Sequence, residues 1–297
     1  MVVVCLLGGG SITAAGASRD APKVAGCRIF PDDNVWNRRV DGLPVHPESE
    51  VLKASIGLTA HLHPDFGSYS GYGIPWNVVR RSTPRSEVTF RWPGESDKGP
   101  YPIPAGPRIE GGSDRHILMV DRDRCRLFEL FAAERHGGAW HAGSGAIWDL
   151  GSNRLRPRGW TSADAAGLPI LPGLARYREV AAGSIRHALR FTAPVTRRAY
   201  VYPARHFASD HTDPELPPMG LRVRLKASVD ISGFPRQARV VLRALQRYGM
   251  ILADNGSPWY VTGAPHPRWD DDALHTLHEV KGTDFEVVDT SGLRNGS

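Results

Sequence analysis

The chain has 297 residues, of which 41% are hydrophobic and 23% charged, and its formal net charge is +6 at pH 7. This composition is typical of a folded globular protein and excludes a disordered or collagen-like chain. The basic residues are scattered, not interleaved with aromatic residues in a nucleic-acid-binding motif, so we expect no nucleic-acid partner. The 32 glycines and 24 prolines favour many short strands and turns over long helices.

Residues 1–17 have features of a secretory signal peptide. A short apolar run leads to small residues around Ala15 and Ala17, as at a cleavage site, although no Lys or Arg precedes the run. No later segment reaches about 18 uninterrupted apolar residues, so we expect no membrane span. These features predict a secreted or periplasmic protein.

The cysteines also favour export. Cys5 would be removed with the signal peptide, whereas Cys27 and Cys125 would remain in an oxidising compartment. We expect a disulfide between these two, which would tie the N-terminal segment to the central strands. Two separate buried thiols are the alternative.

Residues 18–297 are predicted to form a single catalytic or binding domain. Its three parts are a loop-rich segment (18–110) dense in turn residues, a β core (111–230) of short strands, and an α/β extension (231–297). The stretch "GLRVRLKA" (220–227) alternates, which predicts an antiparallel strand with Arg222 and Arg224 on a solvent-exposed face. In the extension, 234–250 and 268–280 predict helices, and Asn255-Gly256 between them predicts a hairpin. We therefore expect a mainly β to α+β fold: an antiparallel β-sandwich core with long N-terminal loops and a C-terminal helix-hairpin-helix extension.

The stretch "AWHAGSGAIWDL" (139–150) places two tryptophans at the ends of a run of small residues. If it forms one strand, Trp140 and Trp148 share a face and lie roughly 26 Å apart. Such a surface would accept a saccharide chain, with His141 and Asp149 beside the rings. Alternatively, both rings fill the core, and the small residues let another layer approach closely.

Several polar residues fall on apolar faces or in loops. Glu129 alternates with apolar residues, so burial would raise its pKa toward that of a general acid; a strand-end glutamate paired with an arginine is the alternative. His116 and His187 also face inward, as acid–base groups or as hydrogen-bonded core residues. Asp164 is a loop carboxylate or, with Thr161, part of a helix cap.

Other candidates lie in loops. Trp160, Arg205 and His206 are potential substrate-binding residues, although a surface charge cluster accounts for the last two equally well. No metal-binding spacing occurs in the sequence, so we expect no metal and no cofactor.

Three stretches, "GWTSADAAGLPILPGL" (159–174), "PMGLRVRLK" (218–226) and "YGMILADNGS" (248–257), resemble a widespread group of secreted bacterial proteins of unassigned function. The resemblance covers most of the chain after residue 17. It implies neither a mechanism nor catalytic residues.

We predict an exported hydrolase that acts on a polysaccharide or cell-wall glycan, with Glu129 as the general acid, Asp164 as its carboxylate partner and His187 as a further acid–base group. The predicted substrate-binding residues are Trp140, Trp148, His141, Asp149, Trp160, Arg205 and His206. A non-catalytic carbohydrate- or wall-binding protein is the main alternative. A serine esterase with Ser144, His187 and Asp164 is a weaker one, because Ala142 and Ala146 replace the glycines of a G-x-S-x-G motif.

Overall fold

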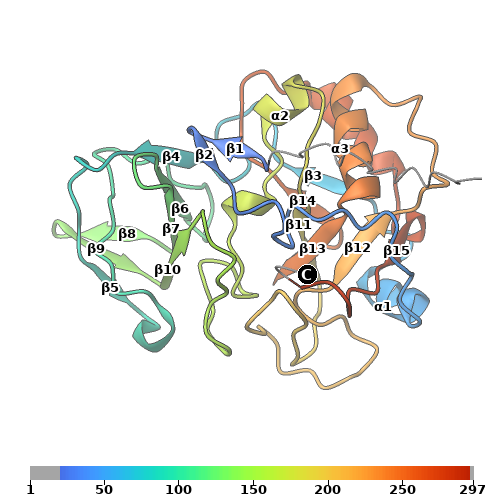
Figure 1. The fold of residues 1–297 in the computed structure, drawn as a ribbon, viewed down its shortest axis with the longest axis horizontal. Helices are drawn as coiled ribbons and strands as arrows, with labels where there is room; N and C mark the ends of the chain where they lie inside the picture. The colour runs from blue at the N-terminus through green and yellow to red at the C-terminus, as the bar shows by residue number, and fades with distance from the viewer. Residues whose placement is uncertain (1–20, 295–297) are drawn as a thin grey trace, which may run out of the picture.

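A computed structural model describes residues 21–294, so the predicted signal peptide and Cys5 lie outside the described residues. The described chain is strand-rich, with four sheets and mostly short helices, in agreement with a mainly β to α+β fold. In Figure 1 the strands between residues 76 and 149 lie at the left, and the strands after residue 189 lie at the right with the longest helix. None of the described helices is long and apolar enough to cross a membrane.

The left half contains two sheets. A four-stranded sheet has the spatial order β10 (Ser144–Asp149), β7 (Arg126–Phe131), β6 (Ile117–Asp121) and β4 (Trp76–Val79), in which only β4 and β6 pair in parallel. A three-stranded sheet is formed by β5 (Val88–Phe90), β9 (Ala139–Ala142) and β8 (Glu134–His136). The short helix η1 (Pro93–Glu95) follows β5.

The right half is a mixed six-stranded sheet covered by helices. Its spatial order is β15 (Phe285–Val287), β12 (Arg222–Leu225), β13 (Met250–Asn255), β11 (Leu189–Ala193), β14 (Tyr260–Thr262) and β3 (His63–Asp65). Helix α3 (Arg236–Arg247) packs its apolar stripe, including Val241 and Leu245, into the main core and contacts β12. The remaining helices are α1 (Ser49–Ile56), η2 (Leu171–Gly173), α2 (Tyr177–Ala181), α4 (Asp271–His275), η3 (Thr276–Glu279) and η4 (Gly282–Asp284).

The predicted C-terminal hairpin does not form. Strands β13 and β14 are consecutive in the sequence, but β11 lies between them, parallel to β13 and antiparallel to β14. The backbone amide of Gly256 donates to the carbonyl of Ala193 at the end of β11. The Asn255-Gly256 turn therefore belongs to a connection that passes the end of β11 and leads from β13 to β14. The two larger sheets belong to different halves of the molecule in Figure 1, and the expected sandwich is not confirmed.

The expected solvent-exposed face of β12 is also wrong, because Arg222 and Arg224 are buried. Both guanidinium groups donate to backbone carbonyls of the N-terminal segment 35–43, which covers this face of the sheet. Arg224 also pairs with Glu286 at 2.7 Å. Burial lowers the pKa of Arg222 to about 9. The alternation correctly separates two faces, but another part of the chain covers the polar one.

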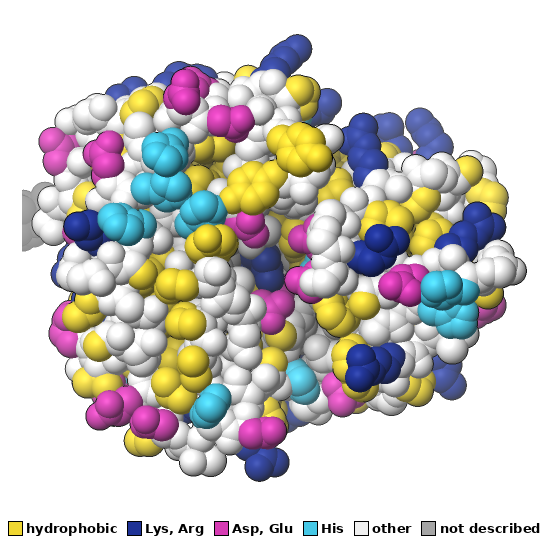
Figure 2. Space-filling view, turned by 180° about the vertical axis from the view of Figure 1, so that it is seen from behind, with side chains coloured by type: hydrophobic (Ala, Val, Ile, Leu, Met, Phe, Trp, Pro, Cys, Tyr) yellow, Lys and Arg dark blue, Asp and Glu magenta, His cyan; other side chains and the backbone are white. Residues whose placement is uncertain are grey.

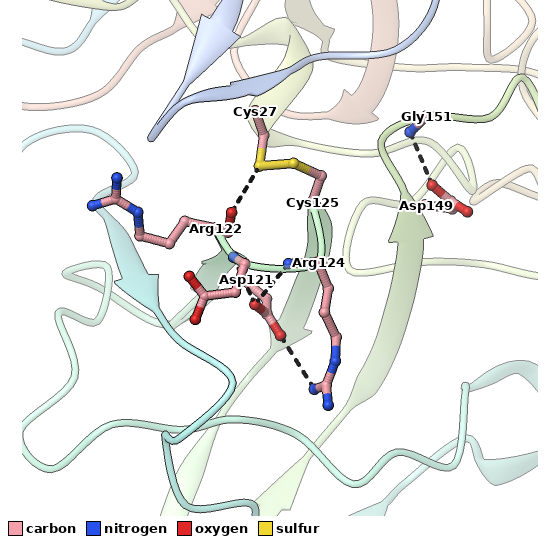
Figure 3. The surroundings of a disulfide bond; sticks show 8 residues. Cys27, Asp121, Arg122, Arg124, Cys125, Asp149 and Gly151 are labelled. Carbon is pink, nitrogen blue, oxygen red and sulfur yellow. Dashed lines mark hydrogen bonds and ion pairs between the residues drawn. A yellow bond between two sulfur atoms is a disulfide. The ribbon is translucent and has the colours of Figure 1, made fainter.

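The predicted disulfide is confirmed: Cys27 and Cys125 are bonded, with their Cα atoms 5.3 Å apart. Cys27 lies in β2 (Cys27–Arg28), which pairs with β1 (Lys23–Val24), and Cys125 immediately precedes β7. Figure 3 shows the bond joining this N-terminal ribbon to the turn that enters β7. The bond therefore connects two segments separated by 98 residues.

Candidate functional site

A β-bulge in β13 determines which way Asp254 points. The pairing with β11 is regular up to Leu252, but Thr192 then lies opposite Asp254, which leaves Ala253 as the extra residue. Side chains alternate between the two faces of a sheet, so without the bulge Asp254 would share a face with Leu252. The bulge instead places Asp254 on the face that carries Thr192 and Arg190, where it approaches the Arg190 side chain.

Arg190 is the buried centre of a charged cluster on this face. Its Nε and Nη2 atoms donate to the two carboxylate oxygens of Asp164 at 3.0 and 2.8 Å, and its Nη1 atom donates to the Thr262 hydroxyl at 2.5 Å. An oxygen of a second carboxylate, that of Asp254, lies 4.0 Å from Nη2. Two acidic side chains therefore face one guanidinium group, and the bidentate pair with Asp164 fixes its orientation.

The two carboxylates differ in their access to solvent. The Asp164 side chain is 0% exposed and is held by Arg190, whereas the Asp254 side chain is 30% exposed. Burial and the negative charge of Asp164 raise the pKa of Asp254 to about 7, against the opposing effect of Arg190. Asp254 is thus an acid that can hold or release a proton near neutral pH while remaining accessible.

Asp65 extends the cluster toward the edge of the sheet. It ends β3 and lies opposite Thr262 of β14, the residue that accepts a hydrogen bond from Arg190. Burial raises the pKa of Asp65; the charge of Arg190 lowers it and that of Glu110 raises it. A hydrogen bond from the Tyr72 hydroxyl also favours the ionised form of Asp65.

The left half of the molecule contributes Glu110 and His116, from the loop before β6. The Nδ1 atom of His116 contacts the Glu110 carboxylate, and its Nε2 atom lies 2.9 Å from the carbonyl oxygen of Ala163. Burial disfavours a charged imidazole, but the hydrogen bond and charge of Glu110 outweigh this effect and raise the pKa of His116. Because Ala163 precedes Asp164, this histidine anchors the loop that carries the Arg190 partner.

A cavity of about 340 Å³ opens above Asp164 and Asp254, and we call it the cleft. Trp92 lies on its rim with 40% of its surface exposed and stacks on Phe131 at 6.2 Å. The cleft is further lined by Glu95, Ser144, Thr161, Ser162, Ala163, Ala165, His206 and Ala208. The face of the molecule drawn in Figure 2 is hollowed between the two halves, and acidic and basic side chains gather there.

Glu129, the predicted general acid, is 0% exposed and does not line the cleft. Its carboxylate accepts hydrogen bonds from the Trp148 indole at 3.0 Å and from the backbone amides of Ile170 and Leu171 at 3.0 and 2.9 Å. Burial raises its pKa to about 7, although these hydrogen bonds act in the opposite direction. These contacts anchor the start of η2 to the four-stranded sheet and leave no route for a substrate.

The predicted serine triad is not assembled. The Ser144 hydroxyl donates to the carbonyl oxygen of Ser162 at 2.5 Å, and Asp164 binds Arg190. His187 is buried elsewhere, with its Nε2 atom 2.8 Å from Arg176 and 3.2 Å from Glu179. The side chains of Ser144, His187 and Asp164 therefore bind different partners, and none of the three bonds to another.

The two tryptophans of the 139–150 stretch do not form a common groove. Gly143 separates β9 from β10, so Trp140 and Trp148 belong to different sheets and pack into different apolar clusters. A Cβ atom on Gly143 would lie 2.6 Å from Phe131, so only glycine fits this crossing. The structure therefore agrees with the alternative interpretation, in which another layer closely approaches the small residues of this stretch.

The remaining predicted binding residues lie in several places. His141 is exposed on β9, whereas Trp148, Asp149 and Trp160 line a second cavity described below. Arg205 donates to the carbonyl oxygen of Arg156 at 2.9 Å, and His206 lines the cleft. Of the predicted site residues, the cleft therefore unites Asp164 and His206.

Arg190, Asp254 and Asp65 were missed. Arg190 lies between Leu189 and Phe191 in an otherwise apolar run, and such a buried arginine requires a carboxylate partner. That signal was available in the sequence. Asp254 gave no usable signal, since a bulge cannot be recognised from one sequence. Among the described residues, no group of three or more His, Cys, Asp or Glu is arranged to hold a metal ion.

Comparison with known proteins adds no relative: no family model matches the chain, and neither a curated protein nor a solved structure matches it significantly.

Proposed function

We propose that the cleft is the active site of a hydrolase that acts on a polysaccharide. The observation that carries the proposal is Asp254, a partly exposed carboxyl with a pKa of about 7 that faces Arg190 beside the Asp164–Arg190 ion pair. Glycosidic bond hydrolysis requires an acid of this kind to protonate the leaving oxygen, together with a second carboxylate. The exposed ring of Trp92 offers an apolar surface on which a sugar ring can stack.

Each carboxylate has a separate role in the proposed reaction. Asp254 donates the proton. The charge of Asp164 keeps the pKa of Asp254 high, and Asp164 does not contact the substrate. We assign Asp65, which ends β3 and does not itself line the cleft, as a base that acts through a water molecule, because Glu110 is already engaged by His116. Strands β13 and β3 are separated by β11 and β14, which puts their backbones roughly 14 Å apart. A base on a strand this far from Asp254 would act on the substrate through water and not by direct attack, so we propose inversion at the anomeric carbon.

We also propose that the protein acts outside the cytoplasm. The disulfide between Cys27 and Cys125 supports this, since such bonds persist in oxidising compartments. A polysaccharide or cell-wall glycan is a substrate suited to that location.

The test is the release of reducing ends from a panel of neutral and acidic polysaccharides. Wild-type protein is compared with Asp254→Asn and with Asp272→Asn, a control that alters an exposed carboxylate on α4. We expect hydrolysis by the wild type and the control but not by Asp254→Asn. Proton NMR of the first product should show the inverted anomer, and a retained anomer would rule out the role given to Asp65.

A non-catalytic glycan-binding protein is the second candidate. It is favoured by the stack of Trp148, Arg156 and Trp160, in which Arg156 lies 5.7 and 5.5 Å from the two ring centres without any contribution from Asp254. Under this alternative, no polysaccharide is cleaved, and Asp254→Asn binds glycan as tightly as the wild type. Cleavage that depends on Asp254 excludes it.

A further inference from the structure

Two more cavities adjoin each other on the left half of the molecule. One, of about 510 Å³, is lined by Trp148, Trp160, Arg126 and Arg154, and the other, of about 640 Å³, by Arg85, Arg124 and Arg126. Both cavities include Arg126 and Asp149 in their walls, so they form one continuous depression. We call it the arginine groove, defined by Arg85, Arg124, Arg126 and Arg154.

The arginine groove is adjacent to the cleft along two segments of the chain. Strand β10 contributes Ser144 to the cleft and Asp149 to the arginine groove, five residues later, or roughly 16 Å along an extended strand. The loop that follows contributes Arg154 and Trp160 to the arginine groove and then Thr161 to the cleft. Ser144 and Asp149 point to opposite faces of the sheet, so the loop, where Trp160 and Thr161 are neighbours, is the path by which an extended polymer would contact both sites.

Positive charge in the arginine groove exceeds what the neighbouring acids neutralise. Arg126 and Arg154 are exposed, and within residues 21–294 their guanidinium groups have no hydrogen-bond or ion-pair partner. Arg85 and Arg124 share a single buried carboxylate, Asp121, at 3.5 and 3.6 Å. Asp149 accepts a hydrogen bond from the backbone of Gly151. Figure 3 shows Arg124 directed toward Asp121, with Asp149 on the neighbouring strand.

The wall nearest the cleft consists of two tryptophan rings packed around an ion-paired arginine. Arg156 is buried between the rings of Trp148 and Trp160, and its guanidinium group bonds to Asp97 at 2.7 Å and to the carbonyl of Thr161 at 2.6 Å. Because Arg156 and Asp97 neutralise each other, they add no net charge to the groove. The Trp160 ring remains partly exposed beside the unpaired arginines. An aromatic ring next to free guanidinium groups suits a ligand with both an apolar sugar face and an anionic substituent.

We propose that the arginine groove binds the acidic groups of an anionic polysaccharide and so extends the cleft along the substrate. The chemistry recognised is a carboxylate or sulfate on successive sugars, which planar guanidinium groups bind in bidentate fashion. This inference rests on the proposed function only in naming the bound polymer as the substrate. The binding itself does not require catalysis.

The test uses the Asp254→Asn variant, so that binding is measured whether or not the cleft is catalytic. Affinity electrophoresis and calorimetry compare polygalacturonate, dextran sulfate, neutral dextran and duplex DNA. We expect binding to a polyanionic glycan at least about ten-fold tighter than to dextran, and Arg126→Gln/Arg154→Gln should lose about ten-fold of it. Preference between the two acidic glycans identifies carboxylate or sulfate as the recognised group.

Matched controls make the result specific. Arg186→Gln/Arg243→Gln removes the same net charge from exposed positions outside the groove and should bind like the parent. Arg126→Lys/Arg154→Lys keeps the charge but loses the bidentate geometry, so it should recover only part of the affinity. The inference is overturned if dextran binds equally well, if both glutamine pairs have the same effect, or if DNA outcompetes the acidic glycans. Binding that persists in a protein without hydrolytic activity would refute the proposed function alone.

Discussion

Glu129 and Asp254 are two acidic side chains with the same pKa of about 7, in different surroundings. Glu129 is fully enclosed, and three donors from Trp148, Ile170 and Leu171 hold its carboxylate. Asp254 is partly exposed at the cleft and faces Arg190 from 4.0 Å. The first carboxyl joins two parts of the fold, and the second faces a cavity of about 340 Å³.

The comparison shows that a raised pKa alone does not identify a catalytic acid. Desolvation raises the pKa of any buried carboxyl, whether or not a substrate can reach it. What separates Asp254 from Glu129 is access to solvent, since the charge of Asp164 raises the pKa of both carboxyls. The following experiments test this distinction, beginning with the largest expected effect.

Activity should separate the two carboxyls most strongly. Asp254→Asn removes the proposed proton donor and should lower kcat by about 10²- to 10⁴-fold. Glu129→Gln alters a residue that no substrate reaches, so the folded variant should keep its kcat. Steady-state rates are measured well below the unfolding temperature of both variants. Equal losses in the two would show that enclosure does not distinguish them.

Stability should depend strongly on the partner of Arg190. Asp164→Ala leaves a buried guanidinium group without its bidentate carboxylate and should lower the free energy of unfolding by about 3–5 kcal/mol. Urea denaturation measures the loss, with Asp272→Ala as the exposed control, which should change it by less than about 0.5 kcal/mol. The double variant Asp164→Ala/Arg190→Met should lose less than Asp164→Ala alone. A larger loss in the double variant would contradict the importance of the unpaired charge.

Glu129→Gln should cost less than loss of the Arg190 pair. The glutamine amide has one acceptor oxygen, so its NH₂ group would face at least one of the Trp148, Ile170 and Leu171 donors. We expect a loss of about 1–3 kcal/mol in the free energy of unfolding by urea denaturation. Glu279→Gln, on the surface of η3, is the control. An unchanged midpoint for Glu129→Gln would mean that these hydrogen bonds contribute nothing.

Per pH unit and per group, the pH dependence of stability gives the smallest effect. The pKa values of Glu129 and Asp254 are raised from 4.5 and 3.8 to about 7, so the folded protein binds more protons than the unfolded chain between these limits. Their contribution is complete below pH 4 and is lost as the pH rises through 7, at a slope of at most about 1.4 kcal/mol per pH unit for each proton. Glu129→Gln and Asp254→Asn should each flatten part of this slope in urea titrations from pH 5 to 8. A slope that neither variant alters would assign the titration to other groups.

Local patterns in the sequence predict part of this structure. The cysteine count led to the disulfide between Cys27 and Cys125, which the structure confirms. Alternation placed Glu129, His116 and His187 on inward faces, and all three are buried. In each case the deciding information lies in the cysteine count or within a few residues of the position concerned.

The rest depends on contacts between distant segments. The insertion of β11 between β13 and β14 joins residues about 60 positions apart, and no turn signal near Asn255 reports it. The bulge at Ala253 reverses the direction of Asp254, although alternation alone gives the opposite face. The arginines of β12 would have pointed to solvent if segment 35–43 had not covered them.

The N-terminal segment between Cys27 and Leu43 acts as a strap across the two halves of the molecule. One end is covalently attached at Cys125, beside the four-stranded sheet, and the other is held by Arg222 and Arg224 in the six-stranded sheet. The cleft lies where these halves meet. The halves therefore cannot move apart without stretching this segment or breaking the hydrogen bonds between its carbonyl groups and the buried side chains of Arg222 and Arg224. The width of the cleft is therefore restrained from a distance, by residues that never contact whatever binds in it.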